Sequence, residues 1–231
     1  MKTSCIVASL LFLSIASSAQ AETFRFQNYQ AAYTLGYDGI PFGKSITTLS
    51  VDAKNHYILC IANKPTLSFI HGAVTECSKG LIFKNTVKPL SYDYYYKRNK
   101  NHNNIHIDFD WAKNIATMKT QKTTWHIAIP QNTQDKISYQ LLLRRGLAEG
   151  VTAFSFPVAD GGKLKIYQFN VVHQQNNTIK LDRTPIPHKE SISLWFRPDL
   201  NYLVSKVRQT KNIADIGTAE LIAYTPLDTH V

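Results

Sequence analysis

After its first 21 residues the chain has no apolar run that could cross a bilayer, which takes about 20 consecutive apolar residues. Glycine and proline are modest, with 10 and 9 residues in a chain of 231, and no tract is of low complexity apart from asparagine-rich loops. We therefore expect a folded domain that is neither disordered nor an integral membrane protein. A chain of this length buries enough surface to form a core without a metal or a disulfide.

Recognisable catalytic motifs are missing as well. The sequence has no Gly-x-Ser-x-Gly turn, no His-Glu-x-x-His pattern and no glycine loop that would hold a phosphate. Cys77 could be imagined as a nucleophile paired with His71, but a thiolate needs a base within hydrogen-bond reach and nothing in the sequence indicates one. We therefore expect no catalytic residues and no cofactor, and the balance favours a protein that is not an enzyme.

The N-terminus is typical of an export signal. Lys2 supplies a positive charge, residues 6–15 are largely apolar, and Ala19-Gln20-Ala21 is a site that a signal peptidase accepts. Glu22 stands where a lipoprotein would need cysteine. We expect cleavage after Ala21 and a soluble domain over residues 22–231 in an extracytoplasmic compartment, the periplasm of a bacterium, although a retained N-terminal anchor is the alternative.

Cysteine is scarce, with three residues in the chain. Cys5 leaves with the signal peptide, so Cys60 and Cys77 remain as an even pair in an oxidising compartment. A disulfide between them is one hypothesis and two buried thiols are the other. A tight hairpin at residues 63–65 would place Cys60 opposite residues near 67 rather than opposite Cys77.

Acidic residues are outnumbered, 16 against 26 lysines and arginines, which gives a net charge of +10 that falls by one with the loss of Lys2. Basic surfaces favour anionic partners such as lipid headgroups or acidic glycans, and nucleic acid is not expected in this compartment. The lysines are scattered, and the densest group, residues 97–100, is typical of a solvated loop. Diffuse charge that serves solubility is therefore the simpler interpretation.

Alternation of apolar and polar residues predicts about a dozen strands. One example is the segment from Ile105 to Trp111, where the apolar residues share one face. The expected strands are residues 24–27, 45–51, 56–62, around 66–75, 80–85, 92–96, 105–111, 123–129, 164–171, 178–183, 191–196, 201–208 and 218–224.

One segment has a helical period instead. Leucines recur at helical spacing between Asp135 and Glu149, with Thr133 or Asp135 able to cap the start and Gly150 able to end the helix. The fold class is therefore all-β and mainly antiparallel, an open or closed meander barrel or a sandwich with one amphipathic helix near 135–149.

Four segments together resemble a known family. They are Phe109-Asp110-Trp111, Asp135 with Ser138 at the helix start, residues 154–172 with their Asp-Gly turn, and residues 194–203, Leu-Trp-Phe-Arg-Pro-Asp-Leu-Asn-Tyr-Leu. In this order and spacing the chain resembles the domain-of-unknown-function 3108 family of exported bacterial proteins. The resemblance implies an antiparallel barrel that carries a helix, and it brings no activity, cofactor or site residues. Val204-Ser205 departs from the proline that members often have there.

Two clusters could bind a ligand. His102, His106, Asp108 and Asp110 offer imidazole and carboxylate groups for zinc, but alternate strand residues lie about 6.6 Å apart, which favours an ordinary solvent-facing strand and no metal. The aromatic residues are the better candidates, because barrels of this size hold apolar ligands and rings stack on sugars. The candidate ligand-binding residues are Tyr92, Tyr94, Tyr96, Trp195 and Tyr202, with core packing as the alternative.

Two functions remain open at this point. The first is a non-catalytic envelope protein that binds a lipid, a glycan or another protein. The second is a hydrolase of a cell-wall polymer, which would need Asp110, Asp135 or Glu149 beside a histidine in one cleft. A purely structural role and the oligomeric state are also undecided.

Overall fold

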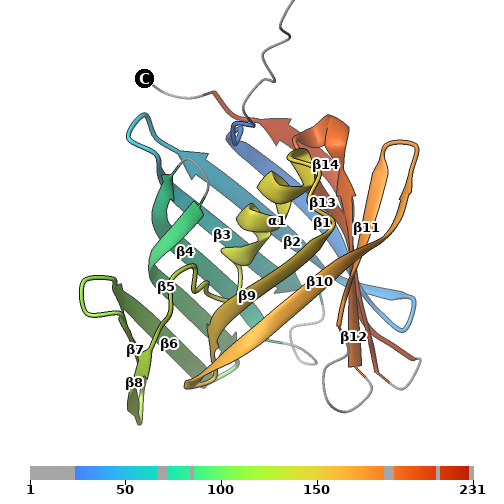
Figure 1. Cartoon of the computed structure of the whole chain (residues 1–231). Coiled ribbons are helices and arrows are strands. Elements are labelled where there is room, and N and C mark those ends of the chain that lie inside the picture. Colours follow the sequence, from blue (N-terminus) through green and yellow to red (C-terminus); the bar gives the residue numbers. More distant parts are fainter. Residues whose placement is uncertain (1–23, 67–71, 84–85, 185–189, 212–213, 229–231) are drawn as a thin grey trace, which may run out of the picture.

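We describe a computed structural model of the chain for residues 24–66, 72–83, 86–184, 190–211 and 214–228 (Figure 1). The signal segment and His71 lie outside the described residues. The elements are β1 (Tyr29–Tyr37), β2 (Ile40–Val51), β3 (His56–Pro65), β4 (Ala73–Phe83), β5 (Thr86–Arg98), β6 (Asn101–Asp110), β7 (Ile115–Thr120), β8 (Thr124–Ala128), α1 (Tyr139–Ala148), β9 (Ala153–Asp160), β10 (Lys163–Gln175), β11 (Thr178–Arg183), β12 (Glu190–Arg197), η1 (Pro198–Leu200), β13 (Leu203–Lys211) and β14 (Ala214–Pro226).

All fourteen strands belong to one antiparallel sheet. Each strand pairs with its neighbours in sequence except at β8 and β9, which are the two edges, and the first strand, β1, pairs with the last, β14. The order is β8-β7-β6-β5-β4-β3-β2-β1-β14-β13-β12-β11-β10-β9. The sheet curls into a nearly closed barrel, as Figure 1 shows, so the expected fold class is confirmed as a barrel rather than a sandwich.

The edge strand β9 pairs with the segment that leads into the helix. Gln134 forms a parallel bridge to Val158: its N–H donates to Pro157, and its carbonyl accepts from Ala159 at 2.9 Å. The edge of β9 is therefore partly covered at this point, and the bridge satisfies backbone groups that an open edge would expose.

Helix α1 lies inside the curve of the sheet (Figure 1). Buried side chains occur around most of its circumference, so it does not have the single apolar stripe of a surface helix. Leu141 packs in a core with β1–β8, whereas Leu143 and Leu147 pack in a second core with β9–β13. Gly146 lets the helix approach β9, because a Cβ there would lie 2.4 Å from the ring of Phe154. The helix thus joins the two halves of the interior.

The termini of α1 follow the predicted signals. In the turn that leads into Tyr139, the carboxylate of Asp135 accepts the N–H groups of Ile137 and Ser138, and Ser138 Oγ accepts the N–H of Asp135, which is the reciprocal pattern of a capping box. At the other end Gly150 has a φ of 81°, and Val151 and Gly150 donate to the carbonyls of Gly146 and Leu147. This pattern is a Schellman motif, which explains why the helix stops before Gly150.

Two strand predictions were wrong. Residues 24–27 alternate in polarity but form no strand, and β1 begins at Tyr29 instead. The two strands expected around 66–75 and 80–85 are one strand, β4, that runs through Gly80. Gly80 is not a turn: the register shifts there and a Cβ would lie 2.2 Å from the carbonyl oxygen of Lys88. Its role is a close approach between strands.

Candidate ligand-binding site

The barrel holds a cavity of about 600 Å³, partly open to solvent, beside the first turns of α1. This volume lies within the range of about 300–1,000 Å³ that is usual for small-molecule sites. Its wall is formed by inward side chains of β1–β5, β13 and β14 and by the helix. Many of these side chains are apolar, among them Leu35, Phe42, Ile61, Val74, Val204 and Val207.

The charged residues of the wall are mostly basic. Arg98, Lys136 and Arg144 line the cavity together with one acid, Glu76. Arg98 and Lys136 are exposed, whereas Arg144 is only 2% exposed. Glu76 Oε2 accepts a short hydrogen bond from the hydroxyl of Tyr92. The cavity therefore combines an apolar wall with an excess of positive charge, an arrangement that favours anionic amphiphiles.

Arg144 reaches from α1 to the segment after η1. Its Nε and Nη2 donate to the carbonyl of Asn201 at 3.2 and 3.0 Å, and Nη2 also donates to Asn201 Oδ1 at 2.8 Å. The guanidinium lies 5.0 Å from the ring centre of Tyr29 and 5.4 Å from that of Phe26. Burial lowers the pKa of Arg144, and the neighbouring hydroxyls of Tyr29 and Tyr33 oppose this. An arginine nevertheless stays protonated in a protein.

A series of buried hydrogen bonds links the turn before the helix to β3 and β4. Ser78 Oγ donates to Asp135 Oδ2 at 2.5 Å, so the hydroxyl of Tyr57, 2.9 Å from Ser78 Oγ, donates to the serine. Burial raises the pKa of Asp135, although its bonds to Ser78 and to the backbone of Ile137 and Ser138 act against the rise. The acceptor capacity of Asp135 is used to hold β4 and the helix together. This role is structural.

Among the described residues, no histidine forms a hydrogen bond or an ion pair with Asp110, Asp135 or Glu149, as acid–base chemistry would need. Asp110 bonds Lys113 at 2.9 Å on the surface, and Glu149 lies exposed at the end of α1. Among the described residues that line the cavity there is no histidine. The arrangement that would have favoured a hydrolase is thus not formed by Asp110, Asp135 or Glu149.

The three tyrosines of β5 share the inner face of the sheet. Tyr96 lines the cavity. Tyr92 is buried, and burial together with the neighbouring Glu76 raises the pKa of its hydroxyl. Tyr94 is half-buried, and the ammonium of Lys136 lies 5.6 Å from its ring centre. Tyr96 is thus the candidate of the three that is placed to contact a ligand directly.

The other two aromatic candidates lie elsewhere. Trp195 lines a smaller hollow of about 300 Å³ with residues such as Thr34 and Glu220, and the ammonium groups of Lys180 and Lys206 lie 5.4 and 5.6 Å from its ring. Tyr202 packs edge-on against Phe24, with ring centres 5.9 Å apart. The structure does not gather the five predicted aromatic residues around one cavity.

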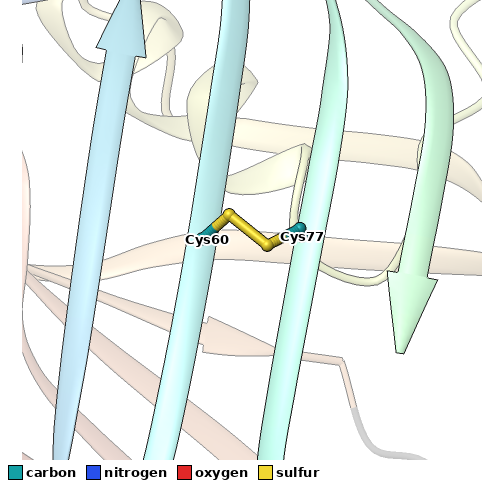
Figure 2. The surroundings of a disulfide bond; sticks show 2 residues. All are labelled: Cys60 and Cys77. Carbon is teal, nitrogen blue, oxygen red and sulfur yellow. A yellow bond between two sulfur atoms is a disulfide. The ribbon is translucent and has the colours of Figure 1, made fainter. Parts of the chain in front are cut away.

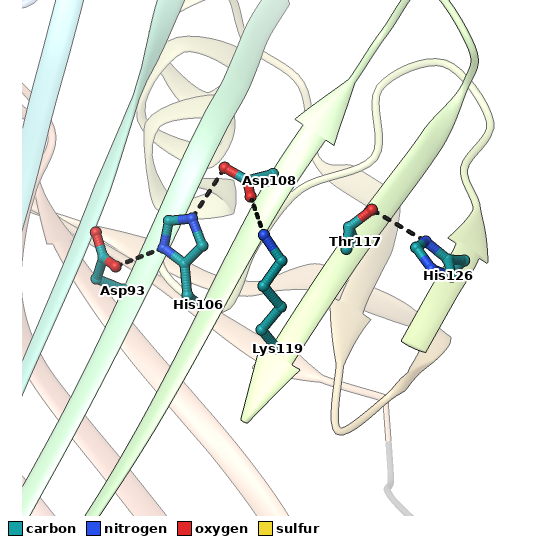
Figure 3. A network of polar contacts seen from close by, with 6 residues as sticks. All are labelled: Asp93, His106, Asp108, Thr117, Lys119 and His126. Carbon is teal, nitrogen blue, oxygen red and sulfur yellow. Dashed lines mark hydrogen bonds and ion pairs between the residues drawn. The ribbon is translucent and has the colours of Figure 1, made fainter. Parts of the chain in front are cut away.

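The histidine and aspartate cluster lies on the outer face of β5–β7 (Figure 3). His106 Nδ1 lies 2.7 Å from Asp93 and Nε2 lies 2.9 Å from Asp108, while Lys119 bonds the other oxygen of Asp108. Burial lowers the pKa of His106, but the bonds to the two carboxylates outweigh this and raise it. No group of three or more metal-binding side chains occurs in the part of the chain that the structure describes.

Cys60 and Cys77 form a disulfide between β3 and β4 (Figure 2). The two residues are direct partners in the strand register, with Cα atoms 4.1 Å apart. A turn at residues 63–65 would have prevented this pairing, but β3 continues through Pro65. The bond lies beside the strand residues that face the cavity, Ile61 and Glu76, and ties the two strands together on the other face.

Comparison with protein families identifies the family of the chain. A family model described as "Protein of unknown function (DUF3108)" matches residues 28–222. The chain belongs to the DUF3108 family. No curated protein matches this DUF3108 chain significantly.

A solved structure is similar to the DUF3108 barrel. It is the crystal structure of a β-barrel-like protein of domain of unknown function DUF1849 from Brucella abortus. The TM-score is 0.59 with 9% sequence identity, over 89% of this chain and 100% of that chain. At so low an identity the similarity concerns the fold alone.

Sequence reasoning missed the most unusual residue of the DUF3108 site. Arg144 lies between the leucines of the expected helix and was not among the predicted site residues. Its neighbour Arg145 is also buried, with Nη1 donating to the carbonyl of Phe83 at 2.8 Å. Two adjacent arginines among the four leucines of this segment were the available signal, because a surface helix places its charges on one face. No described helix is long and apolar enough to span a membrane.

Proposed function

We propose that this DUF3108 protein is a non-catalytic binding protein of the periplasm, made soluble by removal of residues 1–21, and that the interior of the barrel holds a lipid-like small molecule. The observation that carries the proposal is the cavity of about 600 Å³ with its largely apolar wall. The disulfide supports an oxidising compartment, because such bonds persist outside the cytosol.

A lipid-like ligand is favoured over the other partners considered from the sequence. Sugar-binding sites use aromatic faces, but Trp195 and Tyr202 lie away from the cavity that Tyr96 lines. A protein partner would need a broad contact surface, whereas this cavity has the volume of a small-molecule site. Hydrolysis of a cell-wall polymer has no acid–base pair to support it among the residues of the cavity wall that the structure describes.

The test is to block the cavity from one strand. Val74 on β4 lines the cavity, whereas the next residue, Thr75, is exposed on the other face. In Val74→Trp the indole occupies cavity volume, so the fluorescence gain of the uncharged dye N-phenyl-naphthylamine should fall at least about tenfold. Thr75→Trp adds the same ring to the same strand outside the cavity and should bind the dye as the parent protein does.

The result that would contradict the proposal is equal dye binding by both tryptophan variants, or no dye binding by the parent protein. Unfolding of both variants by urea is followed in parallel, so that loss of binding is compared between folded proteins.

A further inference from the structure

Arg144 has no charged partner among the residues that the structure describes. Its hydrogen bonds go to the backbone carbonyl and side-chain oxygen of Asn201, both neutral, and the remaining neighbours of its guanidinium are the rings of Tyr29 and Phe26. Among the described residues no carboxylate pairs with it, and Nη1 is buried without any hydrogen-bond partner. Burying a charge is costly unless it is paired and hydrogen-bonded.

The cavity gives this cation access to a ligand. Arg144 lines the cavity with Gln140 of the helix and with Ile137 of the turn before it, and Tyr29 and Leu203 lie on the facing strands. Glu76, the acid of the described cavity wall, is already engaged by the hydroxyl of Tyr92. The deep cation is therefore an uncompensated charge beside an apolar space.

We propose that the cavity binds a single-chain amphiphile whose anionic oxygen headgroup, a carboxylate or a phosphate, pairs with Arg144. The inference rests on the proposed function and adds the chemical class of the ligand. A guanidinium matches carboxylate and phosphate oxygens with paired N–H donors, and Nη1 has both of its N–H groups to offer. The acyl chain lies along the apolar wall formed by side chains such as Ile61 and Val207.

The exposed cations of the wall, Arg98 and Lys136, have a different role from that of Arg144. They lie among the lining residues but are solvent-exposed, so their charge is screened and attracts an anion rather than holding it. Arg144, shielded from solvent, supplies the interaction that discriminates between anionic and neutral heads.

The test measures how well chain-matched ligands displace N-phenyl-naphthylamine from the full mature protein. The ligands are hexadecanoate, hexadecanol and monopalmitoyl phosphatidylglycerol, which share one chain length and differ in the head. The parent protein should bind at least one of the two anions about tenfold more tightly than the alcohol, because a charge-assisted hydrogen bond is lost with the neutral head. Preference for hexadecanoate indicates a fatty acid, and preference for the phosphate indicates a monoacyl phospholipid.

The matched variant is Arg144→Met, which keeps a long unbranched side chain and removes the charge. It should lose the preference for the anion, with hexadecanol binding within about twofold of the parent protein. Arg144→Lys keeps the charge without the paired donors and should give an intermediate preference. Hexadecanol binding shows that the cavity is intact, so a variant that fails to fold is recognised. The comparison of the three ligands on the parent protein tests the proposal without any variant.

The two possible failures are distinct. If the parent protein binds alcohol and anions equally, or if Arg144→Met binds hexadecanol normally and keeps the preference for the anion, the pairing with Arg144 is wrong while the binding function stands. If no probe of any charge enters the parent protein, the proposed function itself is wrong.

Discussion

Asn201 is the residue on which three parts of the structure converge. Its φ is 54°, in the left-handed region, where asparagine is tolerated better than most residues. Its side chain donates to the carbonyl of Arg25, accepts from the N–H of Gln27 and accepts from Arg144. The residues before β1, the turn after η1 and the helix are thus tied together at one side chain.

Asn201→Ala should lower the free energy of unfolding by about 3 kcal/mol. The change removes the side-chain hydrogen bonds, one of them to a charged group. It also places an alanine in the left-handed backbone conformation, which alanine adopts only at a cost. Urea unfolding followed by circular dichroism measures the difference. Asn176→Ala is the control: its φ is 48°, and its exposed side chain makes no hydrogen bond with the described residues, so about 1 kcal/mol is expected. Equal losses would show that Asn201 acts through its backbone alone.

Contacts of this kind could not be predicted from the sequence. Arg144 and Asn201 are 57 residues apart, and only the curl of the sheet brings the turn after η1 over the helix. Residues 194–203 were recognised as part of a family pattern, but their spacing carried no information on what Asn201 touches. The aromatic candidates were chosen by composition in the same way, which explains why Tyr96 alone of the five lines the larger cavity.

At the scale of elements, local signals determined what was predictable. Helix α1 has its cap, its leucine period and its terminal glycine within a short stretch, so its position was predicted to within a few residues. Strands with clean alternation, such as β6, were predicted equally well. Residues 24–27 failed because alternation says nothing about whether a partner strand is available; β1 and β14 pair with each other beyond them.

The capping box of α1 leads to a pH prediction. Burial raises the pKa of Asp135 above its ordinary value of 3.8. A carboxyl with a raised pKa in the folded state contributes most to stability below the unfolded pKa, and that contribution is lost as pH rises through the folded pKa. Asp135→Asn does not ionise and keeps an oxygen for the N–H groups of Ile137 and Ser138. Its stability relative to the parent protein should therefore increase as pH rises from about 3.8.

Asp199→Asn provides a control of opposite sign. The bond from Arg197 lowers the pKa of Asp199, so the parent protein gains stability from this carboxylate above its unfolded pKa and loses it as pH falls. The asparagine variant should therefore fall behind the parent protein as pH rises. Chemical denaturation at a series of pH values measures both differences. A pH-independent difference for Asp135→Asn would mean that burial does not dominate at this carboxyl.

At the scale of the whole molecule, the sequence predicted the class of architecture and left its closure open. Alternation gives the number of strands approximately. The pairing of β1 with the last strand, β14, depends on the curvature of the sheet and on the total number of strands, which no short stretch of sequence contains. The cavity follows from the same closure, since its wall combines β1–β5 with β13 and β14.

Export and oxidation of the mature chain give one prediction at this scale. Protein isolated from a periplasmic extract should begin at Glu22, and reduction should add the mass of two hydrogen atoms as the bond between Cys60 and Cys77 opens. Intact-mass spectrometry with and without reductant measures both. Cys60→Ser, in which no such gain is possible, is the control. A chain that retains Met1 would contradict cleavage, and a chain without a mass gain would contradict the disulfide.

The pairing of β1 with β14 has a consequence for biosynthesis. The two strands come from opposite ends of the chain, so β1 keeps one row of backbone N–H and C=O groups unsatisfied until nearly the last residue has left the ribosome or the membrane pore. A partly synthesised chain that lacks β14 cannot complete the barrel. During that time the exposed strand edge of the incomplete chain is a target for chaperones that bind unfolded proteins.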